Sequence, residues 1–128
     1  MSEEFKIKIS FVVFGTNIDM NKKYILSLEQ DNIIFPHMTL SMADLSGLDE
    51  KIIQSVKNYV YVNDLELLPQ LITLNSLDLP QEDYTLNVVY GFVIGVTQNI
   101  NNAYWYEFDF LQPNQYTNLL FEVIQKLR

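Results

Sequence analysis

The chain has 128 residues, of which 48% are hydrophobic and 19% are charged, and its formal net charge is −8 at pH 7. Two independent cores in so short a chain would each bury too little apolar surface, so we predict a single domain over residues 1–128. The negative charge repels phosphate backbones and anionic lipid headgroups, which argues against direct nucleic-acid binding and against binding to a membrane. Because the chain has no cysteine, disulfides, thiolate nucleophiles and cysteine-based zinc sites are excluded.

The N-terminal residues do not have the pattern of a signal peptide. Met1-Ser2-Glu3-Glu4 is acidic where a signal peptide is basic, and the apolar residues that follow alternate with Lys6 and Lys8. The longest apolar run, from Val88 to Val96, is far shorter than the roughly 20 residues of a membrane-spanning helix. We therefore expect a soluble protein that works inside a cell, in the cytoplasm, or within a virus particle.

Three strands are predicted in the first part of the chain. Between Phe5 and Val13, apolar and polar residues alternate with the period of a half-buried strand. Residues 24–28 are rich in side chains that suit a pleated surface, which predicts a second strand. Residues 33–35 form a short third strand, which Pro36 ends.

An irregular loop between Pro36 and Gly47 is predicted to lead into a helix. Ser46 is placed as the N-cap of this helix, with the carboxylate of Asp49 three residues further on. Apolar residues then recur at helical spacing, which gives the helix one face for the core. This apolar stripe consists of Leu48, Ile52, Val56, Tyr59 and Val60. Asn63-Asp64 breaks the pattern near the end of the helix.

The second part of the chain repeats the order of strands followed by a helix. Residues 65–74 are extended, and residues 78–83 form a polar connection into a strand over 84–96 that is apolar on both faces, as in a central strand. Residues 104–110 form a last, aromatic strand, and a terminal helix begins at Pro113-Asn114. Its apolar stripe consists of Leu119, Leu120, Val123, Ile124 and Leu127. The pattern predicts a mixed α/β fold of the α+β kind.

This order of elements resembles a Nudix hydrolase domain over most of the chain. Phe35-Pro36-His37-Met38 is similar to the family's Leu-Pro-Gly-Gly corner with both glycines missing, and Asp44 falls where the family has a glutamate. Residues 104–113 are similar to the family's late strand that contains a tryptophan and leads into the final helix. The resemblance implies a mixed β-sheet sandwiched by two helices.

The resemblance stops at the residues that carry the family's chemistry. The family binds magnesium through the clustered glutamates of an Arg-Glu-x-x-Glu-Glu helix, and the matching register here is Ile52-Ile53-Gln54-Ser55-Val56-Lys57. Moving the register by a residue or two does not restore the cluster. Hard divalent cations need several oxygen ligands, usually including carboxylates. We therefore expect an inactive relative with no catalytic residue and no cofactor.

Four residues near the predicted corner are candidates for chemistry. His37 is the sole histidine and could act as an acid, a base or a ligand, but without a second ligand or a triad partner we favour a structural role. Asp44, Asp49 and Glu50 are candidate ligands for a cation. Asp49 and Glu50 also suit the first turn of a helix, whose N-terminal partial charge they complement, and we favour that interpretation. The acidic group in residues 78–83 lacks the frame of a calcium loop and is interpreted as a solvated connection.

Trp105 is the candidate interface residue. Alternation places it on one face of the last strand with two acidic residues, Glu107 and Asp109. The opposite face of the strand is interpreted as core and consists of Tyr104, Tyr106, Phe108 and Phe110. A ring among acidic groups suits contact with a protein better than stacking on a nucleic acid.

These observations support two functions of different classes. The first is a non-catalytic Nudix-like module for interaction or structure, with a protein partner, such as an oligomer or a subunit of a larger assembly like a virus particle. The alternative is a divergent Nudix-type hydrolase or a nucleotide-binding sensor that uses Asp44, Asp49 and Glu50. If the resemblance to Nudix domains is accidental, the chain is another small α+β fold with an interface role.

Overall fold

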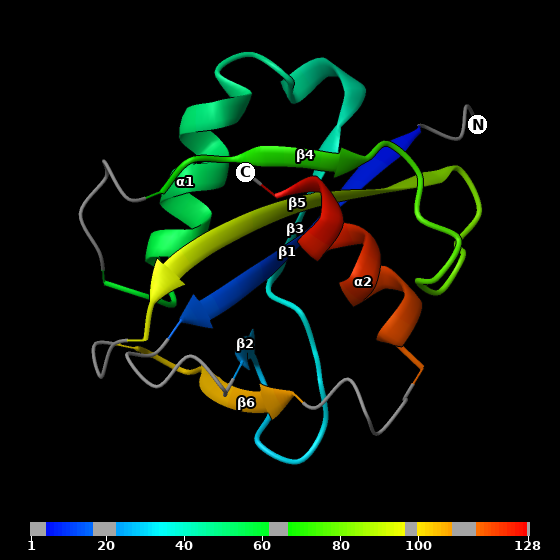
Figure 1. Ribbon diagram of the computed structural model, residues 1–128. Helices are drawn as coiled ribbons and strands as arrows, with labels where there is room; N and C mark the ends of the chain where they lie inside the picture. Colours follow the sequence, from blue (N-terminus) through cyan, green and yellow to red (C-terminus); the bar gives the residue numbers. More distant parts are fainter. Residues whose placement is uncertain (1–4, 17–22, 62–66, 97–99, 109–114, 128) are drawn as a thin grey trace.

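The computed structural model describes residues 5–16, 23–61, 67–96, 100–108 and 115–127. In these residues three strands precede each of the two α-helices, which is the predicted order of strands, helix, strands and helix (Figure 1). The elements are β1 (Lys6–Thr16), β2 (Lys23–Ser27), β3 (His37–Ser41), the 3₁₀ turn η1 (Met42–Asp44), α1 (Leu48–Lys57), β4 (Gln70–Thr73), β5 (Thr85–Gly95), β6 (Tyr104–Phe108) and α2 (Thr117–Lys126).

The strands form one mixed sheet in the order β4-β5-β1-β2-β6, with β3 paired to β1 beside this path. The centre of the sheet is the parallel pair β1 and β5, which stay in register from Lys6 and Thr85 to Thr16 and Gly95. The other edge of β1 is shared, because β3 pairs antiparallel with its first half and β2 pairs antiparallel with its end. This confirms the predicted fold class, a mixed α+β architecture, and the central position of the strand predicted over 84–96.

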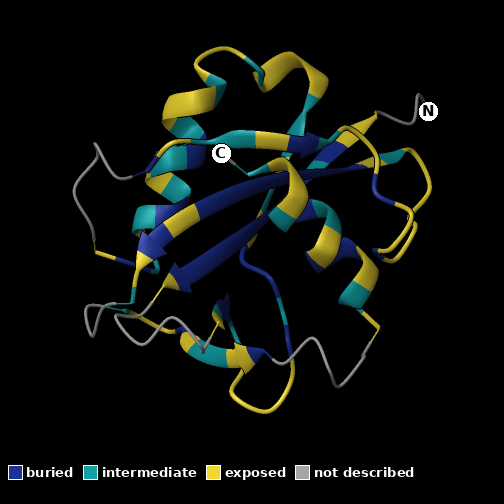
Figure 2. Ribbon diagram, viewed as in Figure 1, coloured by how far each residue is buried: buried dark blue, intermediate teal, exposed yellow. Residues whose placement is uncertain are grey.

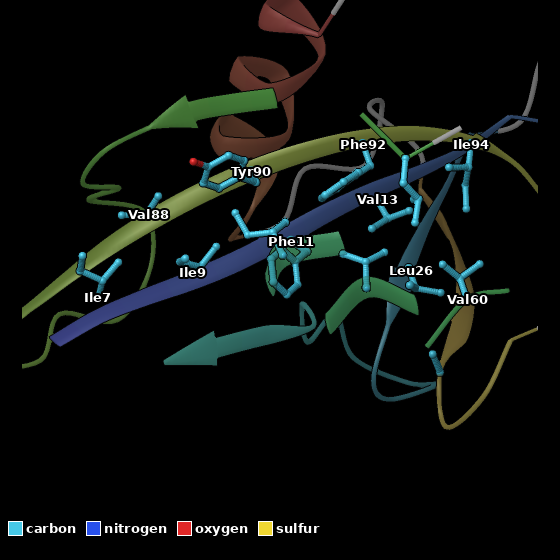
Figure 3. Close-up of a cluster of buried hydrophobic side chains, with 14 residues drawn as sticks. Ile7, Ile9, Phe11, Val13, Leu26, Val60, Val88, Tyr90, Phe92 and Ile94 are labelled. Carbon is cyan, nitrogen blue, oxygen red and sulfur yellow. The ribbon is translucent and has the colours of Figure 1, made fainter. Parts of the chain in front are cut away.

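The two helices cover opposite faces of this sheet. On one face, Ile52 and Val56 of α1 pack in a first cluster with the residues of β1 and β5 that alternate from Ile7 and Val88 (Figure 3). On the other face, Leu119, Leu120 and Val123 of α2 pack in a second cluster with Val12, Phe14, Ile25 and Val89. Figure 2 shows β1 and β5 as the most deeply buried part of the sheet. The predicted apolar stripes are therefore confirmed within the helices, whereas Tyr59 and Val60 lie beyond the end of α1 and Leu127 lies beyond the end of α2.

Two of the predicted strands need correction. Half-burial of the first strand is wrong from Ser10 onward, because Ser10, Val12 and Phe14 are buried on the α2 face as well. Residues 33–35 are not a strand: the paired strand begins at His37, inside the predicted loop. Ile33 and Phe35 are buried by packing in the second cluster instead of by strand pairing.

The predicted N-cap of α1 also needs correction. The helix begins at Leu48, and the residue in the N-cap position is Gly47, which has a φ of 64° and provides no side-chain cap. Only glycine takes this left-handed conformation without steric cost, so Gly47 sets the entry into the helix. Ser46 lies outside the cap.

Several predicted boundaries fall outside the described residues, namely Asn63-Asp64, Phe110 and Pro113-Asn114. In the described part, α2 begins at Thr117. No helix among the residues that the structure describes is long and apolar enough to span a membrane.

Candidate functional site at the corner between β3 and α1

The corner that leads from β3 through η1 into α1 contains the candidate residues of the sequence. His37 starts β3 with an exposed side chain, and its Nδ1 lies 3.0 Å from the carbonyl oxygen of Phe35. Asp44 ends η1, where its Oδ2 accepts a 2.7 Å hydrogen bond from the Ser41 hydroxyl. The ammonium of Lys51, one turn into α1, donates to the Asp44 carbonyl oxygen at 2.6 Å. The corner is thus tied together by hydrogen bonds that include one cationic side chain.

Asp49 and Glu50 lie in the first turn of α1 but serve different sides of the helix. Burial raises the pKa of the Tyr90 phenol above its ordinary value, and the Asp49 carboxylate raises that pKa further. Asp49 is itself exposed, and its charge acts on the Tyr90 phenol. Glu50 lines a hollow on another side, as expected for consecutive helical residues, which point about 100° apart.

The hollow beside α1 has a volume of about 550 Å³ and opens widely to solvent. Three of its residues, Lys51, Gln54 and Ser55, have the i, i+3, i+4 spacing that places side chains on one helical face. The complete lining is Met38, Ser46, Gly47, Glu50, Lys51, Gln54, Ser55 and Asn58. The side chains facing this hollow are thus mostly uncharged, with one acid and one base.

A second register of the helix against the Arg-Glu-x-x-Glu-Glu pattern places the compared residues on the hollow. In the register taken from the sequence, Val56 occupies a glutamate position, yet this side chain is 1% exposed and belongs to the first cluster. Moving the register two residues towards the N-terminus brings Lys51, Gln54 and Ser55 to the three glutamate positions, all on the hollow. The sequence pattern alone had not singled out these three residues; the position of the buried stripe is the signal that identifies them.

The structure does not gather the predicted ligands at one point. Among the described residues, no group of three or more histidine, aspartate or glutamate side chains is arranged to hold a metal ion. In the connection between β4 and β5, Asp78, Glu82 and Asp83 are exposed, which agrees with a solvated loop.

Trp105 lies in β6 at the far edge of the sheet from β4. Its half-buried ring packs against the first cluster, and a Cβ atom built on Gly15 would lie 2.7 Å from its Cζ3. The opposite face is only partly core, since Phe108 is buried whereas Tyr104 is 44% exposed. Contact between Trp105 and a protein partner stays a prediction.

Comparison with known proteins identifies the fold. No family model matches the chain, and no curated protein matches it either. Among solved structures, a MutT/nudix family protein from Enterococcus faecalis is similar with a TM-score of 0.53 and 12% identity, over 84% of this chain and 45% of that chain. The present chain therefore spans less than half the length of that protein.

Two further solved structures match over most of their own length. The NUDIX domain of Shewanella oneidensis NrtR, in a cocrystal with ADP ribose, has a TM-score of 0.53 and 10% identity over 99% of this chain and 80% of that chain. The C-terminal domain of mouse MUTYH, in a complex with human PCNA, has a TM-score of 0.59 and 11% identity over 94% of this chain and 87% of that chain. At these identities the likeness concerns the fold, and the fold of this chain is Nudix-like.

Proposed function

We propose that this chain is a non-catalytic Nudix-like module that binds a protein partner, as a subunit of a larger assembly such as a virus particle. The observation that carries the proposal is the face of α1 at the hollow. There the three positions with the spacing of the family's glutamates hold a lysine, an amide and a hydroxyl, in Lys51, Gln54 and Ser55. Magnesium needs clustered oxygen ligands, and an ammonium repels a cation.

The arrangement of the remaining acids supports the same proposal. The carboxylate of Asp44 accepts a hydrogen bond from Ser41, and the backbone carbonyl of Asp44 accepts one from the Lys51 ammonium. The charge of Asp49 acts on the Tyr90 phenol, whereas Glu50 lines the hollow. A divergent hydrolase or nucleotide sensor that uses Asp44, Asp49 and Glu50 would need these three carboxylates to converge on one cation. Partner binding has a precedent in this fold, since the MUTYH domain is similar in structure and is in a complex with PCNA.

Two measurements on the full chain test the proposal. The first is hydrolysis of ADP-ribose and other nucleoside diphosphate derivatives with Mg²⁺ or Mn²⁺, for which we expect no turnover above that of buffer. The second is the native mass of the complexes recovered with the protein from its source, where we expect a defined stoichiometric assembly. Metal-dependent turnover at ordinary enzyme rates would overturn the non-catalytic assignment, and a free monomer in the source would overturn the assembly role.

A gain-of-function variant provides the positive control. The triple change Lys51→Glu, Gln54→Glu and Ser55→Glu places three carboxylates on the hollow beside Glu50. Like charges one turn apart destabilise a helix, so we expect a lower melting temperature that Mg²⁺ or Mn²⁺ restores by binding the folded state. The matched control places the same charges elsewhere on the chain, as Gln70→Glu, Thr85→Glu and Gln125→Glu, and should show no such metal dependence. If the metal stabilises both variants equally, the hollow is not the position of the family's metal site.

A further inference from the structure

The first cluster ends in an exposed apolar patch at the N-terminal ends of β1 and β5. In the sheet, Lys6 pairs with Thr85 on one side and with Ser41 on the other. The residues next to them, Phe5 and Tyr84, stack edge to face with ring centroids 5.5 Å apart. The register brings two more apolar residues to this end of the sheet: Leu86, which pairs with Ile7, and Met42, which directly follows Ser41, the partner of Lys6. We call Phe5, Met42, Tyr84 and Leu86 the end patch; their exposed fractions are 54%, 53%, 49% and 37%.

Tyr84 has a backbone conformation that its side chain does not favour. Its φ is 55°, in the left-handed region that bulky residues rarely adopt. The Lys6 amide donates a 2.8 Å hydrogen bond to the Tyr84 carbonyl oxygen, which helps to hold this conformation. Strained backbone of this kind is concentrated at sites of function. Here the strained conformation presents an aromatic ring at the surface, next to Phe5.

Three acids and two lysines lie around the end patch, and alternation places one of these lysines, Lys6, on the face of β1 opposite Phe5 and Ile7. Asp44 follows Met42 in η1, and Glu82 and Asp83 directly precede Tyr84; all three acids are exposed. Lys51 also reaches this side, where its ammonium donates to the Asp44 carbonyl. In the part of the sequence that holds Tyr84 and Leu86, no lysine or arginine occurs between Lys57 and Lys126. The acidic residues in that interval are Asp64, Glu66, Asp78, Glu82, Asp83, Glu107, Asp109 and Glu122.

The backbone around the patch leaves little for an added strand to bind. β1 is paired on both sides at this end, with β3 and with β5. The outer edge of β5 is occupied as well: Asn87 donates its amide to Asn75 Oδ1 and accepts a hydrogen bond at its carbonyl from the Ser76 amide. A partner that binds here therefore contacts side chains and does not extend the sheet through backbone hydrogen bonds. Three neighbouring strands span about 10 Å, which matches the width of about 10–12 Å of one α-helix.

From these observations we propose that the end patch binds an amphipathic helix of a partner protein, with apolar side chains on the sheet and lysine or arginine at the acidic rim. The docked helix would continue the layer that α1 begins on the same face of the sheet. A second copy of this chain fits less well, because two acidic rims would repel each other. The proposal rests on the protein-binding function proposed above and adds to it the surface and the chemistry of the partner.

The test uses the full chain and two synthetic helical peptides. Both carry the same leucine and phenylalanine face; one is flanked by lysines and the other by glutamates. We expect the lysine peptide to bind at least tenfold more tightly, and its binding to weaken as salt is added. In two-dimensional NMR spectra we expect its amide shifts to centre on residues 5–8, 40–42 and 84–87. Equal binding of both peptides, or shifts centred elsewhere, would overturn the proposal.

Matched variants locate the contact. Leu86→Ser and Val93→Ser change two residues of β5 with similar exposure, 37% and 42%, at an even and an odd position that face opposite sides of the sheet. We expect the first to weaken lysine-peptide binding at least tenfold and the second to change it less than twofold. Tyr84→Asn removes the ring but keeps a residue that tolerates a positive φ, so we expect loss of binding with a melting temperature within about 4 °C of the wild type.

The remaining outcomes separate this proposal from the proposed function. If Val93→Ser weakens binding as much as Leu86→Ser does, the end patch is not the contact. If the protein without peptide dimerises and Tyr84→Asn abolishes the dimer, the occupant is a second copy. Either result leaves the non-catalytic role standing, because that role is decided by the hydrolysis assay.

Discussion

Two aromatic pairs cross the same two central strands on the same face of the sheet, yet their surroundings differ. Phe11 and Phe92 stack edge to face at 6.2 Å, and both are 0% exposed because they lie in the first cluster under α1. Phe5 and Tyr84 stack with nearly the same geometry at 5.5 Å, and both are about half exposed. The side chains are of the same kind. The difference is that α1 covers Phe11 and Phe92 but not Phe5 and Tyr84. Where the helix ends therefore decides whether the apolar side chains of these strands are buried or exposed.

The largest effect that this comparison predicts is on folding stability. We expect Phe11→Ala to lower the free energy of unfolding by about 3–5 kcal/mol, because it removes a buried ring and leaves a cavity. We expect Phe5→Ala, the matched change at the exposed end, to cost about 1 kcal/mol, mainly through the lost contact with Tyr84. Urea denaturation of both variants measures the difference. Equal losses would show that the exposed end is covered in solution.

The next effect concerns the opposite face, where α2 is the cover. A Cβ atom at Gly91 would lie 2.9 Å from Leu127 Cδ2 and 3.1 Å from Val123 Cγ1, whereas one at Gly95 meets nothing within 4 Å. We therefore expect Gly91→Ala to cost about 1–3 kcal/mol by overpacking. Gly95→Ala, four residues later in the same strand, should stay within about 0.5 kcal/mol of the wild type. Thermal unfolding of both variants compares a covered glycine with an uncovered one.

Much of this architecture could be predicted from the sequence, because the signals are local. The apolar run of β5 indicated a central strand, and the stripes of α1 and α2 indicated the faces that pack on the sheet. What was missed depends on residues far away in the chain. Val12 and Phe14 are buried by α2, which begins more than 100 residues later. The apolar run from Phe11 to Phe14 is a local sign of burial on both faces, but it does not show that α2 supplies the second cover.

The candidate site divides in the same way. Phe35-Pro36 and Asp44 predict a site at the corner between β3 and α1, but the sequence does not show that Val56, in a glutamate position of the predicted register, is buried. The end patch gave no signal at all. Residue type does not predict a positive φ for a tyrosine, and the alternation of β1 does not show where the cover by α1 ends.

A smaller effect is expected from the electrostatic interaction between Asp49 of α1 and Tyr90 of β5. Burial raises the pKa of Tyr90, and Asp49 raises it further, so the folded state holds this proton to higher pH than the unfolded chain does. The stability that Tyr90 contributes is fully present below the unfolded pKa of 10.0 and is lost as the pH rises through the folded pKa. We expect Asp49→Asn to lower the pKa of Tyr90 in the folded state. The folded and unfolded pKa values then lie closer together, so less folding stability is lost at high pH and the loss is complete at a lower pH.

Spectroscopic titration of tyrosine ionisation measures this change, with Tyr90→Phe to identify the signal. Glu50→Gln is the matched control, because it removes a carboxylate from the same helical turn that faces the hollow. An equal decrease of the Tyr90 pKa in both variants would mean that the overall charge of α1, and not the position of Asp49, sets the effect.

The smallest effect on stability, and the sharpest contrast with Phe11→Ala, is expected at Tyr84. Tyr84→Gly removes the stacking with Phe5, an interaction worth about 0.5–1.5 kcal/mol, and relieves a left-handed conformation that costs a residue with a Cβ about 1–2 kcal/mol. The two terms have opposite signs and similar size, while glycine adds some entropy to the unfolded chain. We therefore expect a net change within about 1 kcal/mol by urea denaturation. A loss as large as that of Phe11→Ala would mean that the ring is held for folding. A change near zero would mean that the stability of the isolated chain does not depend on this strained, half-exposed tyrosine.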